Sequence, residues 1–392
     1  MLTCQKHLFS LPADITYLNS AYMGPLSWKT QEASARGLQL RAVPSAISAR
    51  DFFEPAERVR SLAARLVNAN TENTAIIPNV AWGTAIVAHN MQPRAGQNVV
   101  LLDEQFPSNV LPWRKWRKLG VELRYVGAPR GVDLDQRARA WSDAVLHAID
   151  QNTVLVAIEQ AHWTDGSLFD LVAIGRAARA VGAMYVVDVT QTIGAYPLDV
   201  QQIGADALIA HCYKSMLCHY GLGFMVLSER MLRGQPVEQS WLLRKNAEDF
   251  SRLVDYQDEY APGARRFDTS VRANPVLILA LEAALEQANA WGAPKITEYT
   301  RAISREFCKA LPVLGLRAAD ETTRAGNIFG LHAQVPLDLE KVRRTLAEQK
   351  VFVSVRGSAI RVSPHVYNDE SDLERLYLAL KDALGVRPSV VD

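Results

Sequence analysis

An aspartate and a lysine that follow two consecutive apolar runs are the residues of this chain most suited to chemistry. Asp188 ends the run Tyr185–Val187, and Lys214 comes shortly after Ala207–Ala210. Ligands of doubly wound sheets bind outside the carboxyl ends of the strands, so both side chains are expected in one crevice. The alternative is a structural ion pair or two solvated loop residues, and the pair alone does not decide between them.

The surroundings of Lys214 favour a catalytic role. The lysine lies among apolar and aromatic neighbours in His211-Cys-Tyr213-Lys214-Ser-Met. Such neighbours tend to lower the pKa of a lysine, and a neutral amine can form a Schiff base. A carboxylate beside a pyridine nitrogen keeps that nitrogen protonated and makes the ring an electron sink. Asp188 and Lys214 together therefore predict a site for pyridoxal 5′-phosphate (PLP).

The segment Asp188-Val-Thr-Gln191, followed by Tyr213-Lys214, resembles the signature of class V aminotransferases. These fold-type I PLP-dependent enzymes include cysteine desulfurases, kynureninases and isopenicillin N epimerase-like proteins. The resemblance runs over most of the chain, from Tyr17-Leu-Asn19 to Arg361-Val-Ser-Pro-His-Val-Tyr-Asn368. It implies that Lys214 forms the Schiff base and then moves the Cα proton, that Asp188 pairs with the pyridine nitrogen, and that Gln191 lies near the phenolic oxygen.

The resemblance also implies contacts to the cofactor ring and phosphate. Phe106, just after the strand Val99–Leu102, would stack on the ring, although an isolated phenylalanine more often belongs to the core. The phosphate needs N–H groups at a helix start, which Val80 and Ala81 would supply. A plain strand–turn–helix connection is the alternative for that segment. His211 and Tyr213 would assist with the phosphate.

A second subunit is also implied. Arg265–Ser270 resembles the loop that crosses the dimer interface of relatives to reach the partner's phosphate, with Thr269 and Ser270 as the contacting residues. A solvent-facing basic loop is the alternative for the arginines. We therefore expect a homodimer with active sites at its interface.

Substrate recognition is expected to depend on an arginine. Arg361 has apolar neighbours on both sides, and burying an unpaired guanidinium is costly, so it must find a carboxylate. That carboxylate belongs either to an internal ion pair or, as the resemblance implies, to the α-carboxylate of the substrate, held bidentately. Asn19, His162 and Trp163 are further candidates for substrate contact, although His162 and Trp163 could equally pack at a strand end.

Cysteines argue against two other chemistries. Desulfurases carry a nucleophilic cysteine before the carboxylate arginine, whereas the corresponding stretch Val353–Ala359 has none, so persulfide transfer is not expected. Cys212 and Cys218 lie near two histidines, but their spacing is not a usual zinc pattern, and no metal is predicted.

Short apolar runs alternate with amphipathic stretches between residues 74 and 227, which predicts an α/β fold with a mostly parallel sheet flanked by helices. The predicted strands are Ala75–Ile77, Val99–Leu102, Leu123–Val126, Val154–Ile158, Tyr185–Val187, Ala207–Ala210 and Phe224–Leu227. We expect residues 1–30 to form an N-terminal arm that also contributes to the small domain, residues 31–270 a large PLP-binding domain, and residues 271–392 a small C-terminal α+β domain. A strand pair, Val351–Val355 with Ala359–Val362, is predicted in the small domain.

The composition excludes several classes of protein. The 392 residues are 48% hydrophobic and 22% charged, with a formal net charge of +1, which argues against a nucleic-acid binder. No apolar run is long enough to span a membrane, and no signal peptide is visible. A cytoplasmic enzyme is expected.

The predicted function is that of a PLP-dependent enzyme acting on an α-amino acid through a Lys214 Schiff base, as a transaminase or a carbon–sulfur or carbon–carbon β-lyase. An epimerase of the isopenicillin N type is the alternative within the family. A non-catalytic α/β binding or regulatory protein is the alternative of another class. The Gly-x-Gly-x-x-Gly fingerprint of a dinucleotide site is absent from Asn79–Thr84, and both Lys214 and Asp188 are present, which disfavours that class.

Overall fold

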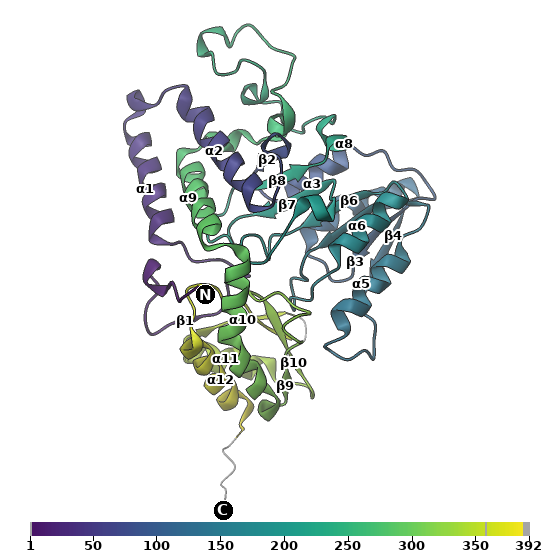
Figure 1. Cartoon of the computed structure of the whole chain (residues 1–392), viewed down its shortest axis with the longest axis vertical. Helices are drawn as coiled ribbons and strands as arrows, with labels where there is room; N and C mark the ends of the chain where they lie inside the picture. The colour runs from purple at the N-terminus through teal and green to yellow at the C-terminus, as the bar shows by residue number, and fades with distance from the viewer. Residues whose placement is uncertain (1, 357–358, 387–392) are drawn as a thin grey trace, which may run out of the picture.

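All seven predicted strands belong to one sheet of the computed structural model, which describes residues 2–356 and 359–386 (Figure 1). The strand order is β2-β8-β7-β6-β5-β3-β4, and only β8 runs in the direction opposite to the other six strands. The predicted α/β fold with a mostly parallel sheet is thus confirmed. The strands are β2 (Thr74–Ile77), β3 (Asn98–Leu102), β4 (Glu122–Val126), β5 (Thr153–Glu159), β6 (Met184–Asp188), β7 (Ala207–His211) and β8 (Gly223–Leu227).

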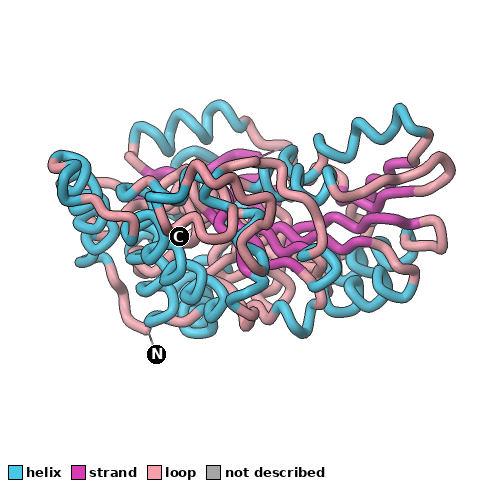
Figure 2. Tube along the Cα trace, turned by 90° about the horizontal axis from the view of Figure 1, so that it is seen from above, coloured by secondary structure: helices cyan, strands magenta, loops and turns pink. Residues whose placement is uncertain are grey.

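Helices cover both faces of this sheet, as the view from above shows (Figure 2). Alternate residues of each strand enter two separate cores: Val187 and Leu208 pack with α2, α5, α6 and α9, whereas Val186 and Ile209 pack with α3. Burial on both faces explains why the strands are apolar runs without polar alternation. The helices are α2 (Arg50–Leu66), α3 (Val80–His89), α5 (Arg137–Ala148), α6 (Leu171–Ala180) and α9 (Pro275–Trp291), with the short α4 (Leu111–Arg114), α7 (Val200–Ile203) and α8 (Glu229–Leu232).

A second, four-stranded antiparallel sheet is formed by the C-terminal part of the chain, in the order β12-β13-β10-β9. Three helices pack on it around a separate apolar core. Its strands are β9 (Leu316–Arg317), β10 (Phe329–Ala333), β12 (Ser354–Arg356) and β13 (Ala359–Val362), and the helices are α10 (Ala293–Ala310), α11 (Leu339–Glu348) and α12 (Glu370–Leu384).

The predicted strand pair in this region is only partly correct. β12 pairs with β13, but the residues before it form a separate strand, β11 (Val351–Phe352), which pairs in parallel with β1 (Thr16–Tyr17). The N-terminal segment thus adds a strand beside the C-terminal part of the chain. Sequence periodicity could not show this, because the two partners lie at opposite ends of the chain.

The first long helix, α1 (Trp28–Ala42), was not predicted, because it carries little apolar periodicity. It packs on α9 through small residues instead, with Ala33 and Gly37 buried. A Cβ atom at Gly37 would lie 2.6 Å from the backbone of Pro275, so only glycine permits this close approach. Among the described residues, no helix is both long and apolar enough to cross a lipid bilayer.

Candidate active site

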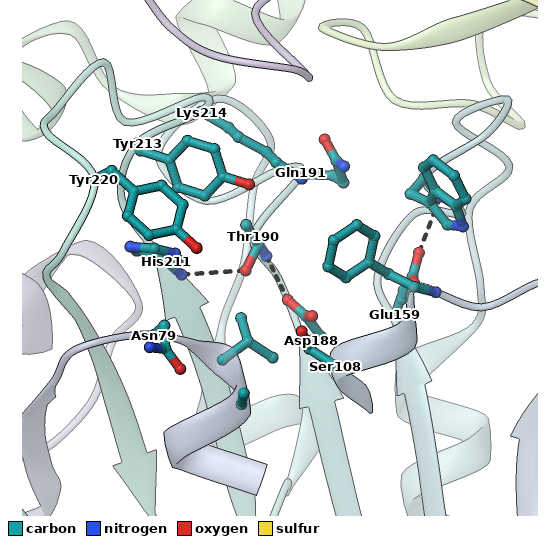
Figure 3. Close-up of a pocket in the computed structure, with 14 residues that line it drawn as sticks. Asn79, Ser108, Glu159, Asp188, Thr190, Gln191, His211, Tyr213, Lys214 and Tyr220 are labelled. Atoms are coloured by element: carbon teal, nitrogen blue, oxygen red, sulfur yellow. Dashed lines mark hydrogen bonds between the residues drawn. The ribbon is translucent and has the colours of Figure 1, made fainter. Parts of the chain in front are cut away.

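The carboxyl ends of β3, β5, β6 and β7 and the start of α3 surround a cavity of about 220 Å³ (Figure 3). Both residues that the sequence singled out, Asp188 and Lys214, line it. The complete lining is Asn79, Val80, Ala81, Phe106, Ser108, Glu159, Trp163, Asp188, Thr190, Gln191, His211, Tyr213, Lys214 and Tyr220.

Lys214 lies in the connection between β7 and the antiparallel β8, so buried strands fix both ends of its loop. Its Nζ atom lies 4.9 Å from the centre of the Phe106 ring and 5.4 Å from that of Tyr213. Burial and the positive charge of Arg361 lower the pKa of Lys214 to about 8, although Asp188 opposes the shift. A substantial fraction of the amine is therefore neutral, and thus nucleophilic, near neutral pH.

Asp188 is the last residue of β6 and is buried at the floor of the cavity. Its Oδ1 atom accepts a hydrogen bond from the N–H of Thr190 at 2.9 Å. Burial raises the pKa of Asp188, while the hydrogen bonds from Thr190 and the charge of Lys214 act in the opposite direction. A buried carboxylate without a cation in contact favours a protonated partner, such as a pyridinium N–H.

His211 is held as a neutral ring. Its Nε2 atom accepts a hydrogen bond from the N–H of Gly221 at 3.2 Å, which places the proton on Nδ1. Burial and Lys214 lower the pKa of His211 to about 4. The ring packs against Tyr213 and Tyr220, at centroid distances of 4.5 and 4.6 Å, and the three rings form one wall of the cavity.

The start of α3 provides an anion-binding geometry. The Asn79 side chain caps the helix by accepting from the N–H of Trp82 at 2.9 Å. The N–H groups of Val80 and Ala81 belong to the first helical turn and have no acceptor within the helix. These groups and the positive end of the helix dipole lie at the cavity, as binding of a phosphate requires.

The donor set fits the PLP that the resemblance implies. An amine, a buried carboxylate, an aromatic face and free helical N–H groups meet the needs of its aldehyde, ring nitrogen, ring and phosphate. In addition, the Oε1 atom of Gln191 is buried without a hydrogen-bond partner among the described residues, and Gln191 lines the cavity. An unpaired buried amide of this kind points to a polar group on a ligand.

Arg361, in β13, forms a hydrogen bond with Trp163, which lines the cavity. Its Nη1 atom donates to the Trp163 carbonyl at 2.9 Å and its Nη2 atom donates to Ser354 Oγ at 3.3 Å, while Nε has no partner. Within residues 2–356 and 359–386, no carboxylate pairs with this guanidinium, although only 1% of Arg361 is exposed. The internal ion pair considered above is therefore not observed in this part of the chain.

Five residues predicted to contact cofactor or substrate do not line the cavity, and Arg361 is one of them. His162 packs on Trp141 at 4.7 Å, and its two ring nitrogens contact Thr164 and the Asp103 carbonyl. The residues Asn19, Thr269 and Ser270 also lie outside.

Each of these three residues has a partner elsewhere. Asn19 accepts a hydrogen bond from Ser354 Oγ at 2.8 Å and so belongs to the surroundings of Arg361. Thr269 Oγ1 and the Ser270 N–H contact Glu238 at 3.3 and 3.0 Å. The role of Thr269 and Ser270 at the phosphate of a partner subunit stays a prediction.

Five lining residues were missed by sequence reasoning: Asn79, Ser108, Glu159, Thr190 and Tyr220. Three of them lay inside segments already singled out, and Glu159 directly follows a predicted strand. The rule that ligands lie beyond strand ends could have found Glu159. Tyr220 returns to the cavity only because β8 is antiparallel, which the sequence did not indicate.

In the part of the chain that the structure describes, no three His, Cys, Asp or Glu side chains lie close enough together to bind a metal ion. Cys212 and Cys218 are buried and unpaired, and burial raises the pKa of both thiols. They lie in the apolar core of the large sheet.

The fold and the site together define a fold-type I PLP enzyme. Residues 45–376 match the aminotransferase class-V family, and the chain belongs to that family. An uncharacterized aminotransferase of Bacillus subtilis, YcbU, is 26% identical over 83% of this chain and 82% of its own. Isopenicillin N epimerase of Streptomyces clavuligerus is 24% identical over 95% and 96%.

Solved structures agree on the fold. The structure of C-DES with glycine covalently linked to PLP superposes with a TM-score of 0.85 at 20% identity, covering 97% of this chain and all of that one. The cysteine desulfurase CsdA of Escherichia coli superposes with a TM-score of 0.81 at 18% identity, covering 97% and 98%.

Proposed function

We propose that this chain is a PLP-dependent enzyme that acts on an α-amino acid, as a transaminase or a β-lyase, with Lys214 as the residue that binds the cofactor and moves the Cα proton. One observation carries the proposal. The buried amine of Lys214, whose pKa is lowered to about 8, shares a cavity with the carboxylate of Asp188. Structural lysines have no need of this combination of burial, lowered pKa and access to a cavity.

When bound, PLP supplies an electrophilic aldehyde carbon and a protonated ring that accepts the electron pair left at Cα. Asp188 holds the proton on the ring nitrogen, and the N–H groups of Val80 and Ala81 bind the phosphate. Arg361 binds the α-carboxylate of the substrate with its guanidinium fork, which orients the Cα–H bond. Lys214 removes the Cα proton.

The fate of the Cα electron pair separates the candidate reactions. The names of relatives support lyase chemistry, since a probable cysteine desulfurase of Methanothermobacter thermautotrophicus is 25% identical over 84% of both chains. The absence of cysteine from residues 353–359 argues against a persulfide relay. We therefore propose β-elimination or transamination without a cysteine nucleophile.

An epimerase is a second candidate, favoured by the isopenicillin N epimerase relatives, which cover 95% of the chain. Epimerisation needs a proton donor on the side of Cα opposite Lys214.

The test begins with borohydride reduction of the purified holoenzyme, followed by peptide mass analysis, which should find the cofactor on Lys214. Single amino acids are then added while the visible spectrum, release of pyruvate or alanine, and chirality at Cα are followed. Conversion to a pyridoxamine spectrum with a single equivalent of keto acid identifies a transaminase. Repeated release of keto acid and ammonia with an unchanged cofactor spectrum identifies a lyase, and loss of chirality alone identifies an epimerase. Lys214→Ala should abolish all three. Cofactor fixed at another lysine would refute the proposal.

We also infer a homodimer, in which Thr269 and Ser270 exchange Glu238 for the partner's phosphate. Mixing Lys214→Ala with Thr269→Ala subunits tests this, because a hybrid dimer carries one intact site. Recovery of activity on mixing is expected, and a strictly monomeric active enzyme would contradict the inference.

The division at residues 30 and 270 stays a prediction. The four unpaired cysteines support the cytoplasm as the proposed location.

A further inference from the structure

Glu159 is a buried acidic residue of the cavity to which the proposed function gives no role. It ends β5, and the register of the sheet places it directly beside Asp188 on β6. Only 3% of the residue is exposed. Within the described chain no cation contacts its carboxylate, so burial and the charge of Asp188 raise the pKa of Glu159 to about 8. Two acidic groups at adjacent strand ends disfavour ionisation of both, whereas the N–H groups of Phe106 and Trp163 and the charge of Lys214 favour the ionised form of Glu159.

The Glu159 carboxylate holds two loops. Its Oε1 atom accepts the N–H of Phe106 at 2.8 Å, and its Oε2 atom accepts the N–H of Trp163 at 2.9 Å. Phe106 follows β3 and Trp163 follows β5, so one side chain fixes the turns after two neighbouring strands. The two aromatic rings meet edge to face, with centroids 5.6 Å apart.

The contacts continue to the substrate arginine. The carbonyl of Trp163, the residue whose N–H Glu159 accepts, accepts the Nη1 hydrogen of Arg361 at 2.9 Å. The guanidinium also lies 5.9 Å from the centre of the Trp163 ring. One residue, Trp163, therefore separates the Glu159 carboxylate from the Arg361 fork.

We propose that Glu159 is a positioning residue, whose carboxylate fixes Phe106 against the cofactor face and, through Trp163, orients Arg361 toward the α-carboxylate of the substrate. This inference rests on the proposed function for its kinetic consequences, but the hydrogen bonds to the two loops are independent of it. A carboxylate suits the position because two N–H donors need two acceptor oxygens. A carboxamide offers one oxygen and turns an NH₂ group toward the other donor.

The test compares wild type with Glu159→Gln, Glu159→Asp and the control Asp206→Asn. Asp206 also accepts a backbone N–H, that of Tyr185, at 2.9 Å. It directly precedes β7, so it lies at the amino end of that strand and not at the carboxyl end, where the cavity is. Thermal unfolding first establishes that each variant is folded. Glu159→Asp keeps both acceptor oxygens and serves if the glutamine variant does not fold.

The first readout is amide hydrogen exchange of the cofactor-free protein above pH 8, where the Glu159 carboxyl is ionised. In Glu159→Gln, at least one of the peptides that contain Phe106 and Trp163 should exchange about tenfold faster, as loss of one charge-assisted hydrogen bond predicts. Peptides containing Asp188 should be unchanged, and Asp206→Asn should leave both loops protected. Unchanged exchange at Phe106 and Trp163 would overturn the proposal.

The second readout is the split between KM and kcat in the holoenzyme. Glu159→Gln should raise KM for the amino acid about tenfold and reduce the preference for the acid over its decarboxylated amine, with a smaller effect on kcat. Glu159→Asp should recover part of the loss. A wild-type KM and acid preference in the glutamine variant, or an equal loss in Asp206→Asn, would overturn the role. If wild type turns over no amino acid, the proposed function fails, while the exchange experiment still decides whether Glu159 holds the loops.

Discussion

The positive charge of Arg361 is, after burial, the main cause of the lowered pKa of Lys214. The two cations come from different sheets, and no carboxylate in the described part of the chain neutralises the guanidinium. A substrate carboxylate bound to Arg361 would cancel that repulsion and raise the pKa of the amine. Lys214 would then be a better base after substrate binds than before.

Stability of the cofactor-free protein should depend on Lys214 and pH. The pKa is about 8 in the folded chain and 10.5 without the fold. Below pH 8 the amine is protonated in the folded and in the unfolded chain, and its buried charge destabilises the fold. Between pH 8 and pH 10.5 the folded chain releases the proton while the unfolded chain keeps it, so the stability of the fold rises with pH. Lys214→Met should therefore raise the unfolding free energy by roughly 3 kcal/mol at pH 7, and by much less near pH 10.

Urea unfolding at the two pH values measures this difference. The exposed Lys118 supplies the control, since Lys118→Met removes a lysine without removing a buried charge. An equal effect of Lys214→Met at pH 7 and pH 10 would show that the amine is not destabilised by its surroundings.

Asp188→Asn should separate chemistry from cofactor binding. The amide still accepts the Thr190 N–H but cannot hold a proton on the ring nitrogen, so kcat should fall about 100-fold or more. The phosphate contacts at α3 are unaffected, and absorbance should show cofactor still bound. Near-normal turnover of the variant would remove Asp188 from the mechanism.

Arg361→Lys should relax the selection of substrates. The lysine keeps the charge but loses the planar fork, so KM should rise about 10- to 100-fold and kcat should fall through misorientation at Cα. The decisive measurement is the ratio of kcat/KM for an amino acid to that for its decarboxylated amine, which should approach one. The surface variant Arg305→Lys, at an exposed ion pair with Glu321, should leave the ratio unchanged. An unchanged ratio in Arg361→Lys would show that another residue binds the substrate carboxylate, and Arg356 would be tested first.

Asp268→Asn should destabilise the fold without altering substrate preference. Asp268 pairs bidentately with Arg60 at 2.7 and 3.1 Å, and both side chains are fully buried. Removing the carboxylate charge leaves Arg60 with only Glu57 as a carboxylate partner and takes from the buried Arg272 its partner at 3.1 Å, which costs about 3–5 kcal/mol. Glu306→Ala, which breaks an exposed pair with Lys309, should cost about 1 kcal/mol or less. Chemical unfolding measures both, and equal losses would contradict the special weight of the buried pair.

Strand periodicity predicted the large sheet because its strands are buried on both faces and therefore apolar without interruption. The same reasoning placed Asp188 and Lys214 in one crevice, since both follow strand ends. It failed where small residues rather than apolar ones make the contact, as at Gly37 on α1. It also failed where a partner lies far along the chain, as for β1 and β11.

Within the site, the sequence left open whether His162 contacts the substrate or packs at a strand end. A histidine near a strand end suggests substrate contact, but the turn directs its ring to Trp141 and leaves the neighbouring Trp163 at the cavity. The sequence analysis did not single out Glu159. Only the three-dimensional position of two backbone N–H groups shows what it does.

The pairing of β1 with β11 also has a consequence for how the protein is made. The N-terminal segment joins β11 through Thr16–Tyr17, and its Gly24 N–H donates to the carbonyl of Tyr213 at 2.9 Å. A nascent chain exposes β1 long before its partner, Val351–Phe352, has been synthesised. Contacts of such large sequence separation form slowly, because the chain entropy of closing the loop is lost before they stabilise it. The segment that links the second sheet to the Lys214 loop must therefore wait unpaired until residues 351 and 352 have been synthesised, and the surroundings of the Lys214 loop cannot be completed before then.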